Sequence, residues 1–407
     1  MDMKVSFFIP PTVGPKEELY KGMAGRRTDL YQNMLTNMTE FAQYCDEHGY
    51  HAIGFTEHHM SVEGMTCSNC PGMLDLYLGM QTKNMHFGVL GYVLPVHDPF
   101  RVAAEVAMLD QMTQGRAIAG FARGVQTRWV NIMGQHRGMA DNITDPEAYT
   151  QTKREWYQEN LEIIKKAWGN DTFSHHGKHW QVPVPNINWP GAKSTQEMGA
   201  GIDAEGKLTE VGVTPACYNK RIPEMYEPFA AHKSSVYTAA KNGLIPVAIQ
   251  TERSLIEEQV REAQRGWADG GIQRAPGEGF GSARYCIVGE TEEEARRFAE
   301  LATFEWTYFF HQFGFTAVLA RGDEDWRTIP LNMDELIERE ILFCGTPDQV
   351  CRQMEKTFKY MPCEHLWLFT GNELLPQHML MKSMDLMTEK VLPNFTSTVK
   401  ASNLQAA

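Results

Sequence analysis

The chain has 407 residues, of which 43% are hydrophobic, and a formal net charge of −13 at pH 7. This length and composition suit a globular protein with a large core, and α/β barrels of this size fold as one domain. The negative charge, without a long basic run, argues against nucleic acid or anionic membranes as partners. No apolar stretch approaches the roughly 20 residues of a membrane span, and the N-terminal apolar run is too short for a secretory signal. The eight scattered cysteines are therefore expected to be reduced thiols in the cytoplasm.

Strand and helix patterns alternate through the first half of the chain. A short apolar run ending in Pro-Pro predicts a strand over residues 5–10, and helical spacing predicts a helix over 27–48. Residues 86–95 are continuously apolar, as a parallel strand covered on both faces would be. Asp98 is a candidate N-cap, with Pro99 at the first helical position. The other expected elements are strands at 51–57 and 115–121 and helices at 71–81, 98–111 and 155–168.

The alternation continues through the second half. The expected elements there are 224–231, 234–242, 245–249, 255–267, 283–288, 292–310, 365–369 and 376–391. Eight strand–helix units imply parallel pairing with right-handed crossovers, and they favour a closed (β/α)₈ TIM barrel over an open doubly wound sheet. Two stretches, 172–223 and 313–342, interrupt the rhythm after the fourth and seventh units. We expect them to be inserted loops or lids within a single barrel domain spanning 1–407.

The residues that follow the predicted strands are the candidate site, because barrel active sites lie at the C-terminal ends of the strands. Ser234 and Ser235 begin a predicted helix, where free backbone N–H groups and the helix dipole favour an anion. Plain N-capping by serine is the alternative. Arg123 follows the fourth strand and carries a guanidinium that matches phosphate oxygens in two-point geometry, which favours a phosphate site.

Two adjacent histidines and a carboxylate, Glu57-His58-His59, follow the second strand. They could bind zinc, but no third ligand arrives at a recognised spacing, so we expect no metal. A neutral imidazole that serves as a base or as a hydrogen-bond donor is the favoured interpretation.

Two other motifs resemble functional motifs but lack part of the required pattern. Cys67 and Cys70 lack the second pair of a zinc site and the βαβ context of a redox motif. We expect unpaired thiols in a loop near the site, with a redox-sensitive or metal-linked pair as the alternative. The glycines of residues 277–281 lack the G-x-G-x-x-G spacing and precede a strand, so we expect no Rossmann-type nicotinamide site.

Segments in almost the whole chain resemble the bacterial-luciferase-like flavin monooxygenases. Residues 97–124 resemble the diagnostic segment of that superfamily, in which Leu-Asp-Gln-Met, two residues and Gly-Arg precede an apolar strand and Arg-Gly. Phe-Thr-Glu-His-His at 55–59, Gly-Tyr-Val-Leu-Pro at 91–95 and Cys-Gly-Thr-Pro at 344–347 agree with it, in the expected order.

The resemblance implies a barrel that binds reduced FMN (FMNH₂) non-covalently. In the family, reduced flavin reacts with O₂ to give a peroxyflavin, which oxygenates an organic substrate. With no nicotinamide motif in the chain, a separate flavin reductase is expected to supply FMNH₂. Family members are often dimers or tetramers, so a homo-oligomer is expected.

The resemblance also implies roles for individual residues. Arg123 corresponds to the arginine that contacts the FMN phosphate, and Ser234 and Ser235 fall where the phosphate loop opens its helix. His58 corresponds to the catalytic histidine, and Glu57 before it is expected at the cofactor site.

Three further positions are expected beside the cofactor. Leu90 and Gly91 fall where some members have a non-proline cis peptide bond against the flavin ring. Ala122 stands where some luciferases carry a reactive cysteine, and its small side chain would leave space beside the flavin. His232 lies where the family often has an acidic residue.

Several functions remain open at this stage. A deazaflavin-dependent hydride-transfer oxidoreductase on the same barrel is the main alternative to the monooxygenase. A non-catalytic flavin-binding subunit is another, although the presence of His58 and Arg123 argues against it. A metal-dependent barrel hydrolase is a more distant one. Tyr92, Trp129 and Met133 suggest an apolar substrate, with simple packing as the alternative.

Overall fold

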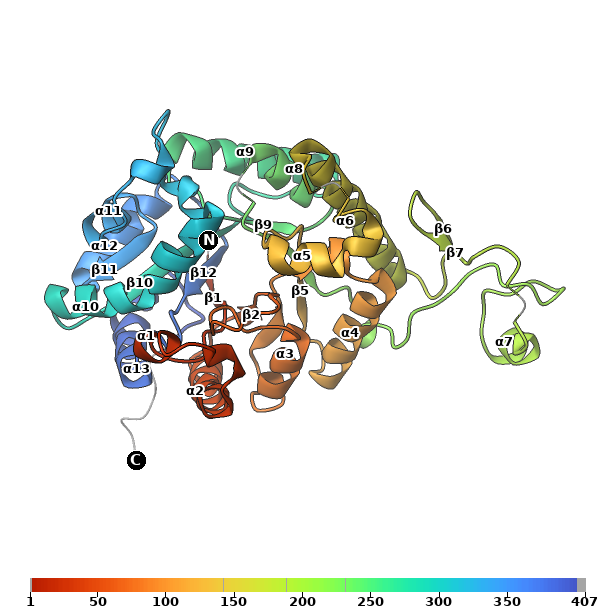
Figure 1. Cartoon of the computed structure of the whole chain (residues 1–407), viewed down its shortest axis with the longest axis horizontal. Coiled ribbons are helices and arrows are strands. Elements are labelled where there is room, and N and C mark those ends of the chain that lie inside the picture. Colours follow the sequence, from red (N-terminus) through yellow and green to blue (C-terminus); the bar gives the residue numbers. More distant parts are fainter. Residues whose placement is uncertain (1, 142, 188, 231, 401–407) are drawn as a thin grey trace. The chain divides into compact units, whose positions relative to one another are not determined.

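The computed structural model describes residues 2–400 except 142, 188 and 231. The chain forms two compact units (Figure 1). Unit 1 consists of Met1–Gly91 and Glu224–Ala407, and unit 2 consists of Tyr92–Pro223. None of the described helices is both long enough and apolar enough to cross a membrane.

Unit 1 is built on a parallel sheet. Its strands run in the order β3-β2-β1-β12-β10-β9-β8, and β11 pairs with β10. The strands are β1 (Lys4–Ile9), β2 (Ala52–Phe55), β3 (His86–Val89), β8 (Glu224–Pro228), β9 (Ile245–Ala248), β10 (Gly281–Val288), β11 (Leu342–Gly345) and β12 (His365–Phe369). Every residue of β10 and β12 is buried, so both faces of these strands are covered, as in parallel sheets generally.

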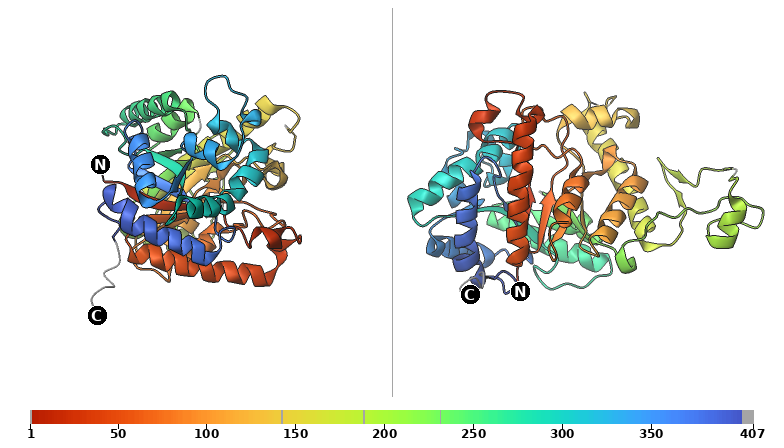
Figure 2. Two further views of the ribbon diagram at one scale, coloured as in Figure 1. Left: turned by 90° about the vertical axis from the view of Figure 1, so that its left-hand side faces the viewer. Right: turned by 90° about the horizontal axis from the view of Figure 1, so that it is seen from below.

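Helices connect the strands of unit 1. They are α1 (Lys16–Leu19), α2 (Thr28–Glu47), α3 (Pro71–Gly79), α8 (Lys233–Lys241), α9 (Arg253–Asp269), α10 (Glu292–Ala302), α11 (Met333–Glu338), α12 (Pro347–Phe358) and α13 (Gln377–Leu386). Figure 2 shows α2 and α13 side by side, and the hydroxyl of Tyr44 on α2 donates to Thr388 Oγ1, just beyond α13, at 3.1 Å. A capping box of Thr346 and Gln349 starts α12.

Unit 2 contains a parallel pair of strands, an antiparallel hairpin and helices. The elements are β4 (Tyr92–Val93), α4 (Pro99–Met112), β5 (Ile118–Ala122), α5 (Thr127–Met133), α6 (Pro146–Gly169), β6 (His175–His176), β7 (Gln181–Val182) and α7 (Ala192–Met198). Strands β4 and β5 pair in parallel, and β6 and β7 pair antiparallel. Asp98 is the N-cap of α4 and accepts a hydrogen bond from the backbone N–H of Phe100 at 2.9 Å, as the sequence predicts.

Most of the expected elements are present within a few residues, but four details differ. The expected strand 86–95 is interrupted at the Leu90–Gly91 peptide bond, which is cis. The expected helix 292–310 ends as α10 at Ala302 and continues as a π-helix over Glu305–Phe309. Strand β11 was not among the eight expected strands, whereas helix α12 begins at the Gly-Thr-Pro sequence whose resemblance predicts a helix start. Helix α5 was not expected either, and the expected element 224–231 extends to Ala231, which lies outside the described residues.

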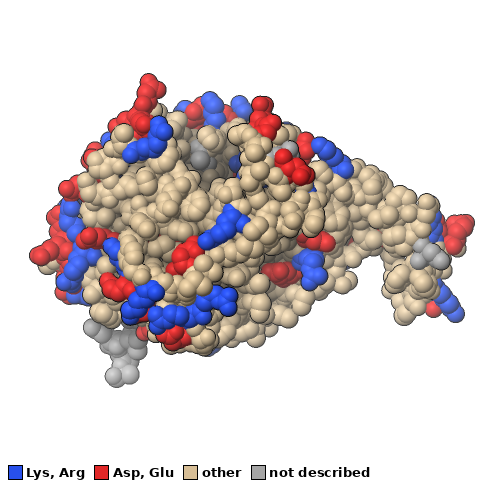
Figure 3. All heavy atoms as spheres, in the orientation of Figure 1, with Lys and Arg blue, Asp and Glu red and all other residues tan. Residues whose placement is uncertain are grey.

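Charged side chains of both signs are interspersed on the face drawn in Figure 3. The sequence has 38 lysines and arginines and 51 aspartates and glutamates.

Candidate functional site

The two adjacent histidines that follow β2, His58 and His59, have different surroundings. Nε2 of His59 lies 2.8 Å from Oε1 of Glu57, and both side chains are largely buried. The neighbouring His58 has a buried Nδ1 without a hydrogen-bond partner among the described residues. Burial lowers the pKa of His58 to about 4, against the opposing charge of Glu57. His58 is therefore a neutral imidazole with a nitrogen available for chemistry.

The ring of His58 borders an aromatic cluster in unit 1. Its centroid lies 6.2 Å from that of Phe310, in the segment between α10 and α11. The cluster extends by ring contacts of 4.7 to 6.1 Å through Phe310, Phe315, Phe229, Phe369, Phe8 and Tyr285. Such a surface next to a neutral imidazole excludes water and suits an apolar molecule.

The cis peptide bond at Leu90–Gly91 follows directly on β3. The backbone N–H of Leu90 donates to the carbonyl of Phe55 at the end of β2, at 2.6 Å. A Cβ at Gly54 would collide with the Leu90 side chain, so the glycine lets Leu90 pack directly over β2. These contacts fix Leu90 at the end of the sheet that also carries His58.

A buried carboxyl group lies at the same end of unit 1. Glu305, in the π-helix, is almost fully buried and accepts a hydrogen bond from Thr12 Oγ1 at 3.1 Å. Burial raises the pKa of Glu305 to about 8, although hydrogen bonds from Thr12 and the Thr66 backbone oppose the shift. Glu305 is therefore mainly protonated at neutral pH, and a π-helix is a frequent feature of functional sites.

The start of α8 carries the two predicted serines. His232 is the N-cap residue, and no side-chain hydrogen bond caps the helix. Ser234 and Ser235 lie in the first turn, with Ser234 exposed and Ser235 half-buried. Serine N-capping, the alternative interpretation, is therefore not what these residues do in the structure. The helix dipole at this terminus favours an anion.

Unit 2 holds two neighbouring cations after β5. Arg123 is half-buried, and Lys153 on α6 donates from Nζ to the carbonyl of Gly124 at 2.9 Å. Burial and, secondarily, the charge of Arg123 lower the pKa of Lys153 to about 8. Two neighbouring cations favour an anionic ligand, since a phosphate would stabilise the charge of Lys153.

Two more residues of unit 2 lie close in sequence to Arg123. Gln126 is 2% exposed, and neither its amide nitrogen nor its amide oxygen has a partner among the described residues. A buried amide without partners is costly, which makes Gln126 a candidate ligand contact. Ala122 packs against the core cluster that includes Val93 and Trp129.

A family model described as "Luciferase-like monooxygenase" matches residues 3–362. The chain belongs to the luciferase-like monooxygenase family. Its enzyme class, a flavin-dependent monooxygenase, is the one that the sequence predicts.

Relatives and solved structures agree with this membership. This chain is 22% identical over 368 residues to 2,5-diketocamphane 1,2-monooxygenase 2 of Pseudomonas putida. The match covers 87% of this chain and 92% of that protein. The chain is 26% identical over 151 residues to 3,6-diketocamphane 1,6-monooxygenase of the same organism, covering 37% of this chain and only 40% of that protein.

A solved structure matches almost the whole chain. It is the oxygenating constituent of 3,6-diketocamphane monooxygenase from Pseudomonas putida, a type II Baeyer–Villiger monooxygenase in complex with FMN. The TM-score is 0.73 at 18% identity, with 97% of this chain and 99% of that chain covered. This likeness confirms the predicted (β/α)₈ TIM-barrel class.

Sequence reasoning missed several residues of this luciferase-like monooxygenase. Lys153 and Phe310 lie far along the chain from the residues that they neighbour in the structure. Glu305 offered a signal, since it continues the buried stripe of α10 (Ala295, Phe298, Ala299, Ala302) where an apolar residue is expected.

The Cys67–Cys70 pair lines a cavity in unit 1. The cavity measures about 550 Å³, and its wall includes Met60, directly after His59, together with Tyr31 and Met73. Neither thiol forms a disulfide; Cys67 is buried and donates to the carbonyl of Ser61 at 3.4 Å, and Cys70 is exposed. The pair therefore belongs to a loop near the candidate site.

Proposed function

We propose that this luciferase-like monooxygenase uses FMNH₂, delivered by a separate reductase, and O₂ to oxygenate a small apolar organic substrate. One oxygen atom would enter the substrate and the other would leave as water, while FMNH₂ is oxidised to FMN. The observation that carries the proposal is the neutral, partnerless Nδ1 of His58 beside an aromatic cluster in a chain of this family.

The anionic end of the cofactor suits the cations of unit 2. Arg123 would contact the FMN phosphate, and Lys153 beside it would add a second positive charge. We further propose the first turn of α8, with Ser234 and Ser235 after His232, as a phosphate contact. The residues fit the group chemically because each offers a cation, a hydroxyl or a helix dipole to an anion.

The apolar ring of the cofactor suits the strand ends of unit 1. Leu90 and Gly91 would pack against the ring, and we also propose Glu57 and, in unit 2, Ala122 as cofactor contacts. When bound, reduced flavin supplies the two electrons that activate O₂. His58 would hold or move a proton at Nδ1, and the phenylalanines would keep water out.

The segments 172–223 and 313–342 remain our candidates for lids over the single barrel domain. The second of them contains Phe315 of the aromatic cluster, which gives it a direct route to influence the substrate. A homo-oligomer also remains a proposal.

The test is turnover with labelled oxygen. The purified chain would be mixed with FMNH₂, isotopically labelled O₂ and a panel of aldehydes, ketones and aromatic compounds. A product with one labelled oxygen atom supports a monooxygenase. Substrate reduction or oxidation without label, above all with a deazaflavin, would indicate a hydride-transfer enzyme instead. NADH-driven turnover should require an added flavin reductase.

A further inference from the structure

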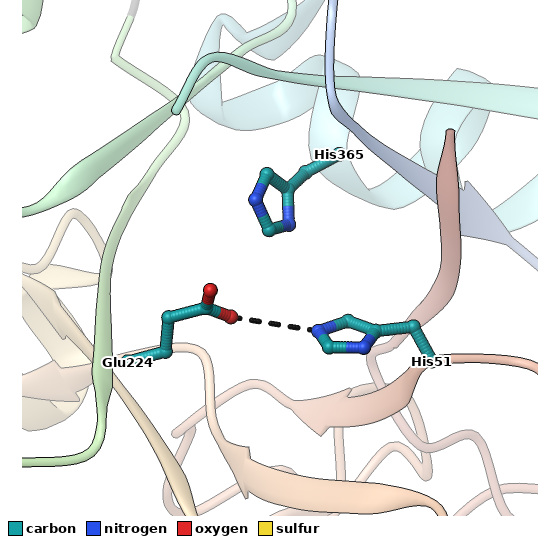
Figure 4. A group of neighbouring side chains, drawn as sticks. All are labelled: His51, Glu224 and His365. Carbon is teal, nitrogen blue, oxygen red and sulfur yellow. Dashed lines mark ion pairs between the residues drawn. The ribbon is translucent and has the colours of Figure 1, made fainter. Parts of the chain in front are cut away.

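Three side chains converge at the N-terminal ends of the unit 1 strands. His51 directly precedes β2, Glu224 begins β8 and His365 begins β12. One ligand atom from each lies within 4.8 Å of the other two, and Figure 4 shows the side chains pointing toward one another. This end of the strands is opposite to the end that carries His58, since His58 follows β2.

Hydrogen bonding assigns the tautomer of His365. The hydroxyl of Tyr226 donates to Glu224 Oε2 at 2.6 Å, so its only proton is committed there. Nδ1 of His365 lies 3.2 Å from the same hydroxyl oxygen and must therefore be the donor. In the neutral ring, Nε2 of His365 then carries the free lone pair.

Neither imidazole Nε2 atom of the cluster has a hydrogen-bond partner within the part of the chain that the structure describes. These two atoms belong to His51 and His365, and both are buried. The His365 side chain is about 1% exposed, and its Nε2 lies 3.7 Å from the nearest carboxylate oxygen, on Glu364. Nε2 of His51 lies 3.5 Å from Glu224 Oε2, which is long for a hydrogen bond. Buried nitrogens without partners are costly and call for a ligand.

We propose that His51, Glu224 and His365 form a binding site for a divalent transition-metal ion of the zinc class. Two imidazole nitrogens and one carboxylate oxygen are a common zinc donor set, and they leave a fourth position for water. Tyr226 would act as an outer partner that orients both His365 and Glu224. The Glu224 side chain is 36% exposed, which gives the ion a path from solvent.

The ammonium of Lys4 lies beside Glu224 and provides a further test of the metal site. Its Nζ lies 3.3 Å from Glu224 Oε1 and 3.2 Å from Glu364 Oε1. The ammonium and the metal ion would compete for Glu224, so removal of the lysine charge should tighten metal binding. If the three side chains only hydrogen-bond to one another and bind no metal, removal of the lysine charge should produce no metal binding.

The bound ion would tie together the starts of β2, β8 and β12, far along the strands from the candidate catalytic residues. The site is independent of the proposed function. The sequence led us to expect no metal, because residues 51, 224 and 365 are too far apart for any ligand spacing to be recognised.

The test is zinc binding to the metal-stripped full-length chain, measured by calorimetry with Zn²⁺ alone. We expect one ion per chain with micromolar or tighter affinity. His51→Gln and Glu224→Gln should each weaken binding about tenfold or more, and Lys4→Met should strengthen it. The exposed His136→Gln is the matched control and should leave the affinity unchanged. His51 is preferred to His365 for substitution, because His365 is fully buried and its loss endangers folding.

Cobalt substitution separates this site from the cysteines. Co²⁺ at two histidines and a carboxylate gives d–d absorption without a thiolate charge-transfer band, and a Cys67→Ser, Cys70→Ser double variant should bind normally. Binding weaker than about 100 μM, or binding that the cysteine variant abolishes and His51→Gln leaves intact, would overturn the proposal.

Discussion

Oε1 of Glu57 lies 2.8 Å from Nε2 of His59, so the carboxylate is paired with the second histidine and not with the first. His58 Nδ1 has no hydrogen-bond partner among the residues that the structure describes. The two neighbouring imidazoles therefore differ: His59 contacts a buried carboxylate, and we propose His58 for proton transfer.

Replacement of His58 tests that division. His58→Ala should lower product formation about 100-fold and raise hydrogen peroxide release per O₂ consumed, since a proton-transfer group is lost. The affinity for FMN should stay nearly unchanged. Product, peroxide and oxygen are measured together, with the exposed His136→Ala as the control. An unchanged ratio of product to peroxide would remove His58 from the mechanism.

Loss of the Arg123 guanidinium should weaken FMN binding. Arg123→Ala is expected to cost about 1.5–3 kcal/mol of binding free energy, the usual size of a charge-assisted contact, or about 10- to 150-fold in Kd. Lys153→Met should weaken binding in the same direction. Arg154→Ala, an exposed neighbour of Lys153 on α6, is the control. The measurement is a fluorescence titration, and equal affinities for the Arg123 variant and the wild type would contradict the phosphate contact.

Glu305 should make stability depend on pH. Its pKa is raised from 4.5 to about 8 by burial, so the folded state holds a proton that the unfolded state releases. This contribution is full below pH 4.5 and is lost as the pH rises from there through 8, on the order of 5 kcal/mol in total. Glu305→Gln should therefore gain stability relative to the wild type between pH 5 and pH 8.5 in urea unfolding. A difference in unfolding free energy that stays constant over this range would show that Glu305 is not protonated in the folded chain.

Substitution of Phe310 should change the catalytic efficiency for the substrate and leave the affinity for FMN unchanged. The Phe310 ring lies 6.2 Å from that of His58 and is buried. Phe310→Leu is expected to lower kcat/KM for the best substrate of the panel about tenfold, with FMN affinity unchanged. Phe313→Leu is the matched control, because Phe313 is 41% exposed. Equal effects of both substitutions would indicate a general loss of stability.

Local sequence signals, such as helix caps and apolar runs, correctly predicted the helices and strands that contain them. Asp98 before Pro99 marked the start of α4, and the apolar run through Val89 marked a buried strand. The start of α8 was found within one residue. In each case the signal lies within a few residues, where capping and periodicity act.

The missed residues depend on contacts between distant parts of the chain. Lys153 is recognisable only from its neighbour Arg123, and the hydrogen bond from Thr12 to Glu305 joins residues that are far apart in the sequence. His51, Glu224 and His365 come from three strands whose starts meet only in the folded sheet. A single sequence does not show which distant residues come into contact. A family motif such as residues 97–124, in contrast, indicates the fold as a whole.

The central claim is that this chain binds reduced flavin mononucleotide as the reagent of its chemistry. The most direct measurement is an anaerobic titration of the purified full-length protein with FMNH₂. We expect saturable binding at low micromolar concentrations, with clear preference over a reduced deazaflavin. No saturation at high micromolar FMNH₂, or tighter binding of the deazaflavin, would contradict it.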